Sequence, residues 1–253
     1  MRVFLLDIPI DAITRDAAKT KILAYLSEEK AHLVTTPNPE MAVAASQDRA
    51  FLAALQQADL AIPDGFGLRL GAWLSGRRVP ETITGVDFML DIAEIAAKEG
   101  SGIYLLGGEN GVAAEAGRHL QKRFPGLVIS GASSDDKVII DNRGRVGIAQ
   151  ATMEKIRQAA PRILFVAFGH GKQERWIVDN IRELPSVRVA MGVGGAFDFL
   201  AGRIRRAPIF MRKLGLEWFW RLVLEPRRLP RIWNAVVVFL LLIIRRKIHT
   251  LKP

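Results

Sequence analysis

The residues of this chain that could do chemistry lie in short polar or glycine-rich segments that follow apolar runs. There are five such segments, at residues 35–41, 62–67, 106–110, 168–174 and 192–198. In an open parallel sheet, ligands bind beyond the carboxyl ends of the strands. We therefore expect the functional site where strands lead into helices.

Asp64 is the strongest candidate for a catalytic group. It follows a short apolar run and stands between Pro63 and Gly65, where loop backbone can hold a carboxylate and direct it into a cleft. A carboxylate in such a place can act as a general base that withdraws a proton from an acceptor hydroxyl. An ordinary Asp-Gly turn is the competing interpretation.

Polar side chains in two other segments are suited to bind a sugar or a base. Thr36 and Asn38 place a hydroxyl and an amide on one loop, although Asn38 could equally cap the helix expected at 39–46. Gln173 and His170 flank the entry to another expected helix. His170 could be a base or a polar loop residue.

Four glycines are candidates for a cradle around a nucleotide diphosphate: Gly107, Gly108, Gly194 and Gly195. Glycine lets the backbone approach a ligand closely, and the N-terminus of the following helix attracts phosphate. Neither a G-x-x-x-x-G-K-[ST] loop nor a complete dinucleotide fingerprint is present. Tight strand-to-helix turns would require the same glycines.

Composition excludes several kinds of site. Without cysteine the chain has no disulfide, no thiolate zinc site and no iron–sulfur cluster. Its four histidines show no H-x-x-H or H-E-x-x-H spacing, so we expect neither a metal nor a cofactor. We interpret the acidic pairs Asp7/Asp11 and Asp135/Asp136 as solvated loops.

The pattern of apolar runs and amphipathic segments predicts an α/β fold, a Rossmann-like parallel sheet flanked by helices. Strands are expected near 3–7, 32–35, 60–62, 103–106, 127–130, 162–168 and 187–191. Helices are expected near 15–29, 39–46, 86–98, 110–124, 148–159 and 172–184.

Positive charge is concentrated after residue 202. Residues 203–253 contain 13 Lys/Arg against 2 Asp/Glu, or +11, whereas residues 1–202 contain 23 against 24. We therefore divide the chain into an α/β catalytic domain, 1–202, and a basic, membrane-associating helical appendage, 203–253. The appendage should form helices at 209–224 and 229–244, separated near Pro226.

The appendage has the features of a surface that lies on an anionic membrane. It combines arginines with Trp218, Phe219, Trp220 and Trp233 and with the uncharged run 232–244. That run has 13 residues, whereas a spanning helix needs roughly 20, so an in-plane or re-entrant segment is favoured. The buried half of a dimer interface is the alternative, and we expect self-association when lipid is absent.

The N-terminal sequence predicts the cellular location of the catalytic domain. It reaches an aspartate after only four apolar residues, which is too short for the apolar core of a signal peptide. We expect a peripheral or monotopic protein at the cytoplasmic face of the membrane.

Two other functions compete with a membrane enzyme. A nucleic-acid-binding protein would explain the basic, tryptophan-rich tail, but its uncharged run gives a solvated arm no advantage. A nucleotide-dependent oxidoreductase would suit the expected sheet, but the dinucleotide fingerprint is missing.

Five blocks of sequence carry a family resemblance: TPN at 36–38, ADLAIPDG at 58–65, FVAFGHGKQE at 165–174, GVGGAFDFLAG at 192–202 and GLEWFWRL at 215–222. In this order they resemble the WecG/TagA/CpsF family of glycosyltransferases. The similarity extends to about residue 231. The remainder of the apolar run and the basic segment 245–247 lie beyond it.

The resemblance implies an inverting, metal-independent transfer from a UDP-sugar to the sugar of a polyprenyl-diphosphate-linked acceptor. It also implies an appendage that touches the membrane and closes over the active site. Asp64 matches the family's proposed general base, and polar donor-pocket residues match Thr36, Asn38 and Gln173. Arg221, Arg228 and Arg231 have the spacing of arginines thought to reach the diphosphates.

The chemistry of the residues agrees with that assignment. Inversion requires a single displacement and hence one base. Without a metal, the charge that develops on UDP must be met by cationic side chains, N–H groups and helix dipoles. The sugar transferred stays open among N-acetylmannosamine, its uronic acid, glucose and other hexoses.

Overall fold

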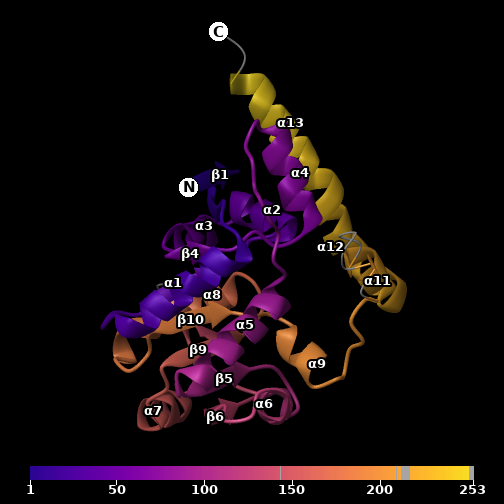
Figure 1. Cartoon of the computed structure of the whole chain (residues 1–253). Helices are drawn as coiled ribbons and strands as arrows, with labels where there is room; N and C mark the ends of the chain where they lie inside the picture. Colours follow the sequence, from indigo (N-terminus) through magenta and orange to yellow (C-terminus); the bar gives the residue numbers. More distant parts are fainter. Residues whose placement is uncertain (143, 209, 212–216, 251–253) are drawn as a thin grey trace.

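A six-stranded parallel sheet forms the centre of the protein, as the sequence predicts (Figure 1). The computed structural model describes the whole chain except residues 143, 209, 212–216 and 251–253. Across the sheet the strands are β4 (Leu60–Ala61), β3 (His32–Thr35), β10 (Val189–Gly192), β9 (Ile163–Ala167), β5 (Ile103–Gly107) and β6 (Ile129–Ser133). The four inner strands, β3, β10, β9 and β5, are almost wholly buried, as expected where helices cover both faces.

Helices cover the two faces of the sheet in separate hydrophobic clusters. One face packs against α1 (Arg15–Ser27), α5 (Gly85–Lys98), α6 (Val112–Arg123) and α9 (Ala196–Leu200). The other packs against α7 (Gln150–Ala159) and α8 (Lys172–Asn180), which continues as a 3-10 turn, Ile181–Glu183. All of these helices except α9 were expected from the sequence, with ends that differ by a few residues.

A third cluster lies outside the sheet, and most of it was not predicted. The expected strand at 3–7 is instead half of an antiparallel hairpin, β1 (Arg2–Leu5) and β2 (Ile8–Asp11). It packs with α2 (Pro39–Gln47), α3 (Arg49–Gln56) and α4 (Phe66–Leu74). The hairpin turns because Leu6 and Asp7 both adopt positive φ, 49° and 67°, as a two-residue turn requires.

The hairpin corrects the prediction of a solvated loop for Asp11, which is the last residue of β2, whereas Asp7 does lie in an exposed turn. The carboxylate of Asp11 accepts hydrogen bonds from Arg2 at 3.0 and 2.8 Å and from the backbone N–H of Ala61 at 2.9 Å. Asp7 ends the turn and forms an ion pair with Arg246. These carboxylates therefore fasten the hairpin to β4 and to the C-terminal helix.

The segment after β6 also differs from its prediction. It contains a small antiparallel pair, β7 (Ile139–Ile140) and β8 (Val146–Gly147). Asp136 is not solvated, because one carboxylate oxygen accepts a hydrogen bond from the Thr152 hydroxyl at 2.5 Å and the other is buried. Asp135 is exposed, and its carboxylate accepts a hydrogen bond from the backbone N–H of Asn110.

The appendage begins with the non-helical residues 203–208, and its described part from Glu217 onward is mainly helical, with an interruption at Pro226. Of the helix expected at 209–224, the structure describes α11 (Glu217–Leu224), while residues 209 and 212–216 lie outside the described part. After the 3-10 turn Pro226–Arg228 come α12 (Leu229–Trp233), a π-helical segment (Asn234–Val238) and α13 (Phe239–Thr250).

One face of the C-terminal helix packs on the body of the protein, beside α4 (Figure 1). Phe239 and Ile243 are buried in the third cluster. A Cβ atom added to Gly71 would lie 2.6 Å from the Phe239 ring, so a glycine is needed for this close approach. Part of the apolar run 232–244 therefore belongs to the chain's own core. Neither of the two predicted alternatives for this run, a membrane segment or a dimer interface, includes this packing.

In the part of the chain that the structure describes, no helix has both the length and the apolarity needed to cross a bilayer.

Candidate active site

The carboxyl edge of the sheet brings the predicted site residues into one row. From β4 to β5, the carboxyl ends of neighbouring strands and the segments that follow them carry Asp64, then Thr36 and Asn38, then Gly194 and Gly195, then Gln173 at the start of α8, and finally Gly107 and Gly108. Loops from adjacent parallel strands meet at this edge, where open α/β sheets bind ligands.

Asp64 is held between the loop after β3 and the start of α5. Its backbone N–H donates to the carbonyl of Pro37 at 2.9 Å, and its Oδ2 accepts from the backbone N–H of Gly85 at 3.1 Å. Gly85 is the first residue of α5, and a helix N-terminus attracts a carboxylate through its unpaired N–H groups and dipole. Asp64 is half-buried, so its side chain is positioned without being closed off from solvent.

Thr36 lies close to the same helix start. A Cβ atom on Gly85 would lie 3.1 Å from the Thr36 hydroxyl and 3.6 Å from Asp64 Oδ2. Because Gly85 lacks this atom, the hydroxyl, the carboxylate and the helix N-terminus can meet. A hydroxyl beside a carboxylate is suited to orient a sugar.

Asn38 caps α2. Its Oδ1 accepts from the backbone N–H of Met41 at 2.9 Å, which confirms the helix-capping interpretation for this oxygen. Its predicted contact with the donor stays a prediction.

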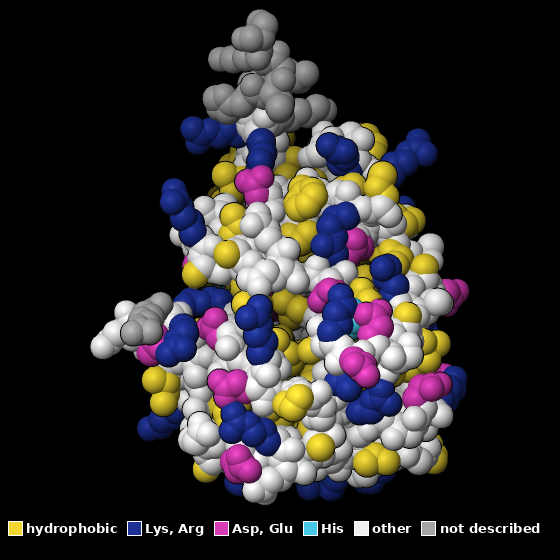
Figure 2. Space-filling model, turned by 90° about the vertical axis from the view of Figure 1, so that its left-hand side faces the viewer, with side chains coloured by type: hydrophobic (Ala, Val, Ile, Leu, Met, Phe, Trp, Pro, Cys, Tyr) yellow, Lys and Arg dark blue, Asp and Glu magenta, His cyan; other side chains and the backbone are white. Residues whose placement is uncertain are grey.

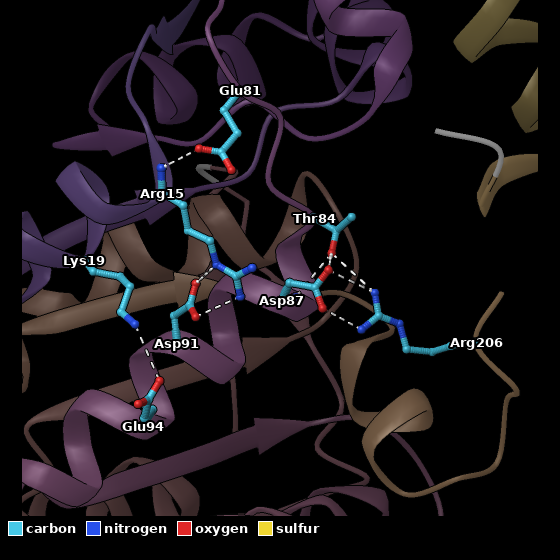
Figure 3. A network of polar contacts seen from close by, with 8 residues as sticks. All are labelled: Arg15, Lys19, Glu81, Thr84, Asp87, Asp91, Glu94 and Arg206. Carbon is cyan, nitrogen blue, oxygen red and sulfur yellow. Dashed lines mark hydrogen bonds and ion pairs between the residues drawn. The ribbon is translucent and has the colours of Figure 1, made fainter. Parts of the chain in front are cut away.

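A network of ion pairs fixes the N-terminal turn of α5 (Figure 3). Thr84 caps the helix and donates from its hydroxyl to Asp87 at 2.7 Å. Arg206, from the segment after α9, donates to both carboxylate oxygens of Asp87 at 2.7 and 3.2 Å and also pairs with Glu217 of α11. The appendage is thereby fastened to the helix whose first N–H group holds Asp64.

The electrostatics of Asp87 follow from these contacts. Burial raises its pKa, but hydrogen bonds from Arg206 and Thr84 outweigh burial and bring the pKa below its ordinary value. One turn further along α5, Asp91 forms a bidentate ion pair with Arg15 of α1 at 2.6 and 2.8 Å (Figure 3). Ion pairs thus hold α5 both at its N-terminal turn and one turn further along.

Gln173 is buried, with 4% of its surface exposed, and both ends of its amide bind protein groups. Its Oε1 accepts from the backbone N–H of Gly194 at 3.0 Å, and its Nε2 donates to Glu174 at 2.8 Å. The residue assigned to the donor pocket by resemblance therefore joins the loop after β9 to the loop after β10.

Glu174 is a buried carboxylate that the sequence alone did not single out. Burial raises its pKa to about 7, against the opposing effect of hydrogen bonds from Gln173 and from backbone N–H groups. The adjacent Gln-Glu pair at the start of a helix gave no signal of burial, since Glu is almost always exposed.

Replacing Glu174 by glutamine should flatten the pH dependence of stability. The folded protein binds a proton at about pH 7, whereas in the unfolded chain the carboxyl has its ordinary pKa of 4.5 and binds that proton only at lower pH. The stability linked to this proton is therefore full below about pH 4.5 and is lost as the pH rises through 7. Urea unfolding should show the stability of the wild type relative to Glu174→Gln falling by on the order of 3 kcal/mol across this window. A constant difference would contradict the assignment.

The four predicted cradle glycines have different structural roles. A Cβ atom on Gly107 would lie 2.7 Å from the carbonyl oxygen of Ala167, and one on Gly108 would lie 2.2 Å from Val112. The N–H of Gly108 donates to the Ala167 carbonyl at 3.1 Å, so this pair serves tight packing. Around Gly194 the space is open, and a Cβ atom on Gly195 would only come to 3.8 Å from Asp198 Oδ2, although the N–H of Gly194 already binds Gln173.

The three arginines assigned by resemblance fall on the appendage. Arg221 lies on α11, Arg228 ends the 3-10 turn and Arg231 lies on α12. Their side chains are outside the described part of the structure, so their contacts with diphosphates stay predictions.

The sequence did not reveal the residues that position Asp64, namely Thr84, Gly85, Asp87 and Arg206. The spacing of Thr84 and Asp87 is that of a capping box and could have located the start of α5. Nothing local in the sequence indicates that Arg206 would pair with a residue 119 positions away. Among the described residues, no group of three or more His, Asp or Glu side chains could hold a metal ion.

Comparisons with known proteins show the family to which the chain is similar. The sequence profile of the family described as "Glycosyl transferase WecG/TagA/CpsF family" matches residues 3–253. An N-acetylglucosaminyldiphosphoundecaprenol N-acetyl-beta-D-mannosaminyltransferase of Bacillus subtilis is 32% identical over 82% of this chain and 77% of the relative. A protein of the same name from Staphylococcus aureus is 27% identical over 97% of this chain and 93% of the relative.

Proposed function

Because the chain belongs to the WecG/TagA/CpsF family of glycosyl transferases, we propose that it transfers a sugar from a UDP-sugar to the sugar of a polyprenyl-diphosphate-linked acceptor. The names of its relatives favour N-acetylmannosamine as the transferred sugar and N-acetylglucosaminyldiphosphoundecaprenol as the acceptor. Such a transfer is a step in the biosynthesis of a cell-surface polysaccharide.

One observation carries the mechanism: the half-buried carboxylate of Asp64 is held at the N-terminus of α5 on the carboxyl edge of the sheet, and its neighbour Asp87 is already paired with Arg206. We propose that Asp64 accepts the proton of the acceptor hydroxyl while that oxygen attacks the anomeric carbon. The new carbon–oxygen bond forms as the bond to UDP breaks, and UDP leaves with the electron pair. Thr36, beside Asp64, would orient the reacting sugar.

The reaction proposed here inverts the anomeric centre. UDP-sugars of this kind carry the sugar in α linkage, and the relatives are named for transfer of a beta-D-mannosaminyl group. A single displacement at the anomeric carbon accounts for that change and needs one base.

The charge on departing UDP must be stabilised, and we propose that this is done without a metal. The N–H group of Gly195, beside the Gly194 N–H that binds Gln173, and the side chains of Arg221, Arg228 and Arg231 are the groups proposed for this role. Arginine binds phosphate oxygens through a planar fork of N–H donors, and such donors are most effective where water is excluded.

We further propose that the protein lies on the cytoplasmic face of the membrane through the exposed sides of α4 and the C-terminal helix. Trp73 is 70% exposed and Leu241 is 60% exposed. Arg69 of α4 and Arg245 of α13 are exposed as well. On the face shown in Figure 2, which is the left-hand side of Figure 1, Lys and Arg side chains also lie among hydrophobic side chains over the upper part of the molecule. Apolar side chains with basic neighbours suit an anionic lipid surface.

Replacing Trp73 and Leu241 together by glutamate should weaken binding to vesicles of anionic phospholipid at least tenfold, because two apolar side chains leave the lipid and two negative charges replace them. Sedimentation with vesicles measures this. Ile139→Glu is the control, since Ile139 is also exposed but lies on the separate β7–β8 hairpin. Equal binding by the double variant and the control would contradict the assignment of this surface.

The activity itself is tested with a panel of UDP-sugars and a short-chain polyprenyl-diphosphate-N-acetylglucosamine, with mass spectrometry of the lipid product. We expect transfer of N-acetylmannosamine. No transfer from any donor would contradict the proposed function.

A further inference from the structure

Two consecutive side chains at the start of α8 form a buried chain of hydrogen bonds between two loops of the site. Glu174 is 1% exposed, and its carboxylate accepts from the backbone N–H of Gly171 at 2.7 Å and from Gln173 Nε2 at 2.8 Å. Gln173 Oε1 then accepts from the N–H of Gly194 at 3.0 Å. The chain therefore runs from the loop after β9 to the loop after β10.

The donors and acceptors permit only one direction for this chain. The two backbone N–H groups at its ends can only donate, so Gly171 needs an acceptor on Glu174 and Gly194 needs the oxygen of the Gln173 amide. The amide of Gln173 must therefore turn Nε2 to Glu174 and Oε1 to Gly194. A neutral amide at position 174 could not impose this orientation without placing two donors against each other.

The surroundings leave Gln173 no alternative position. A Cβ atom on Gly192 would lie 2.6 Å from Gln173 Nε2, so the amide packs directly on the backbone of β10. Gly194 adopts a φ of 52°, a conformation that the hydrogen bond from its N–H group helps to hold. What Glu174 fixes is thus the shape of the loop that leads to Gly195.

We propose that Glu174 is a positioning residue, which orients Gln173 so that Gln173 holds the Gly194 loop in the shape that receives the diphosphate of the donor. This inference rests on the proposed function for the identity of the donor. Glu174 touches no substrate in this scheme, and Gln173 acts on the donor through the loop.

Exchanging the two side chains provides the test. Glu174→Gln alone places the NH₂ group of the new amide against another N–H donor. Gln173→Glu alone places two carboxylates side by side. In the double variant Gln173→Glu/Glu174→Gln, the new glutamine accepts from Gly171 and donates to the new glutamate, which accepts from Gly194. Length, charge and every hydrogen bond of the chain are thereby conserved.

Three measurements are made on the full-length wild type, both single variants and the double variant. Amide hydrogen exchange at Gly194 reports the loop without any ligand, calorimetry with UDP reports donor binding, and transfer kinetics report KM and kcat. We expect each single variant to lose about tenfold or more in Gly194 protection, in line with loss of a buried hydrogen bond. UDP affinity should fall, and donor KM should rise, by a similar factor, with acceptor KM unchanged. The double variant should recover to within about threefold of the wild type.

Two results would overturn the proposal. The first is unchanged Gly194 protection in both single variants. The second is a double variant that regains protection but not UDP binding, since Gln173 would then contact the donor directly. If a single variant fails to fold, the double variant decides alone: it must fold, protect Gly194 and bind UDP. A wild type that transfers no sugar would contradict the proposed function, whereas Gly194 exchange would still test the role of Glu174.

Discussion

Asp64→Asn should transfer sugar about 10²–10⁴ times more slowly than the wild type, the usual contribution of a positioned general base. Asparagine has the same shape as aspartate and can still accept the hydrogen bond from the Gly85 N–H group, so the fold and the loop should persist. What is lost is the capacity to accept the acceptor's proton. Steady-state kinetics with saturating acceptor measure kcat, and calorimetry with UDP should give a dissociation constant close to that of the wild type.

Glu109→Gln is the matched control for this variant. Glu109 is an exposed residue in the loop after β5, at the same edge of the sheet, and its replacement removes one negative charge without touching Asp64. We expect its kcat within about twofold of the wild type. An Asp64→Asn enzyme that retains a third or more of the wild-type kcat would show that another group takes the proton.

Arg206→Gln should have the second-largest effect, because it releases the start of α5 from the appendage. Asp87 would lose its two hydrogen bonds from Arg206 and remain half-buried, with Arg15 as a more weakly interacting cation. Loss of one partner of such a pair costs on the order of 1–3 kcal/mol. Because Gly85 lies in the same helical turn and binds Asp64, we expect kcat to fall about tenfold, while UDP affinity changes little.

The same variant should respond differently to acid. The pKa of Asp87 is lowered in the folded protein, so the stability from its pair with Arg206 is present above the ordinary pKa and is lost as the pH falls through the lowered value. Without Arg206 this contribution disappears, and acid unfolding should begin at a higher pH.

Arg203→Gln provides the comparison for Arg206. Arg203 belongs to the same segment after α9, but it pairs with Glu115 of α6 and not with α5. We expect its kcat within about threefold of the wild type. Equal losses in the two variants would mean that the appendage acts by some route other than the start of α5.

The central sheet could be predicted from the sequence because its signals are local. Runs such as 103–106 and 163–168 are apolar throughout and alternate with amphipathic segments, and a strand buried on both faces requires this pattern. The placement of the site follows from the same pattern, since every parallel strand ends at the same edge. Asp64 and Thr36 could thus be assigned to one site before the structure was described.

The N-terminal hairpin could not be predicted, because its two-residue turn contains Leu6, and leucine is seldom found in such turns. Leucine at a positive φ, as at Leu6, is unfavourable for the isolated chain and is held here by the packing of both strands in the third cluster. Pro9 also argued against a strand. It is accommodated in a two-stranded hairpin outside the central sheet.

The packing of the C-terminal helix was missed for a different reason. An apolar run between arginines has the same composition whether it faces lipid or a protein core. Only the element that packs against it in the tertiary structure distinguishes the two cases. That element is α4, where Gly71 lets the two helices approach closely, whereas Gly67 packs against Pro39 of α2.

The chain Gly171–Glu174–Gln173–Gly194 and the Arg206–Asp87 pair were also beyond sequence reasoning. Each joins side chains whose proximity depends on the order of strands in the sheet, and strand order is not encoded in any local pattern. The sequence could suggest which residues do chemistry, whereas the tertiary structure was needed to show which residues hold them in place.

The most direct test of the mechanism is the anomeric configuration of the product formed in EDTA. The wild-type enzyme is incubated with UDP-N-acetylmannosamine and polyprenyl-diphosphate-N-acetylglucosamine, and the new linkage is assigned by nuclear magnetic resonance. We predict a β-linked product, formed at an undiminished rate when divalent metal is removed. An α-linked product, or turnover that stops in EDTA and returns with added metal, would contradict a metal-independent displacement assisted by Asp64 alone.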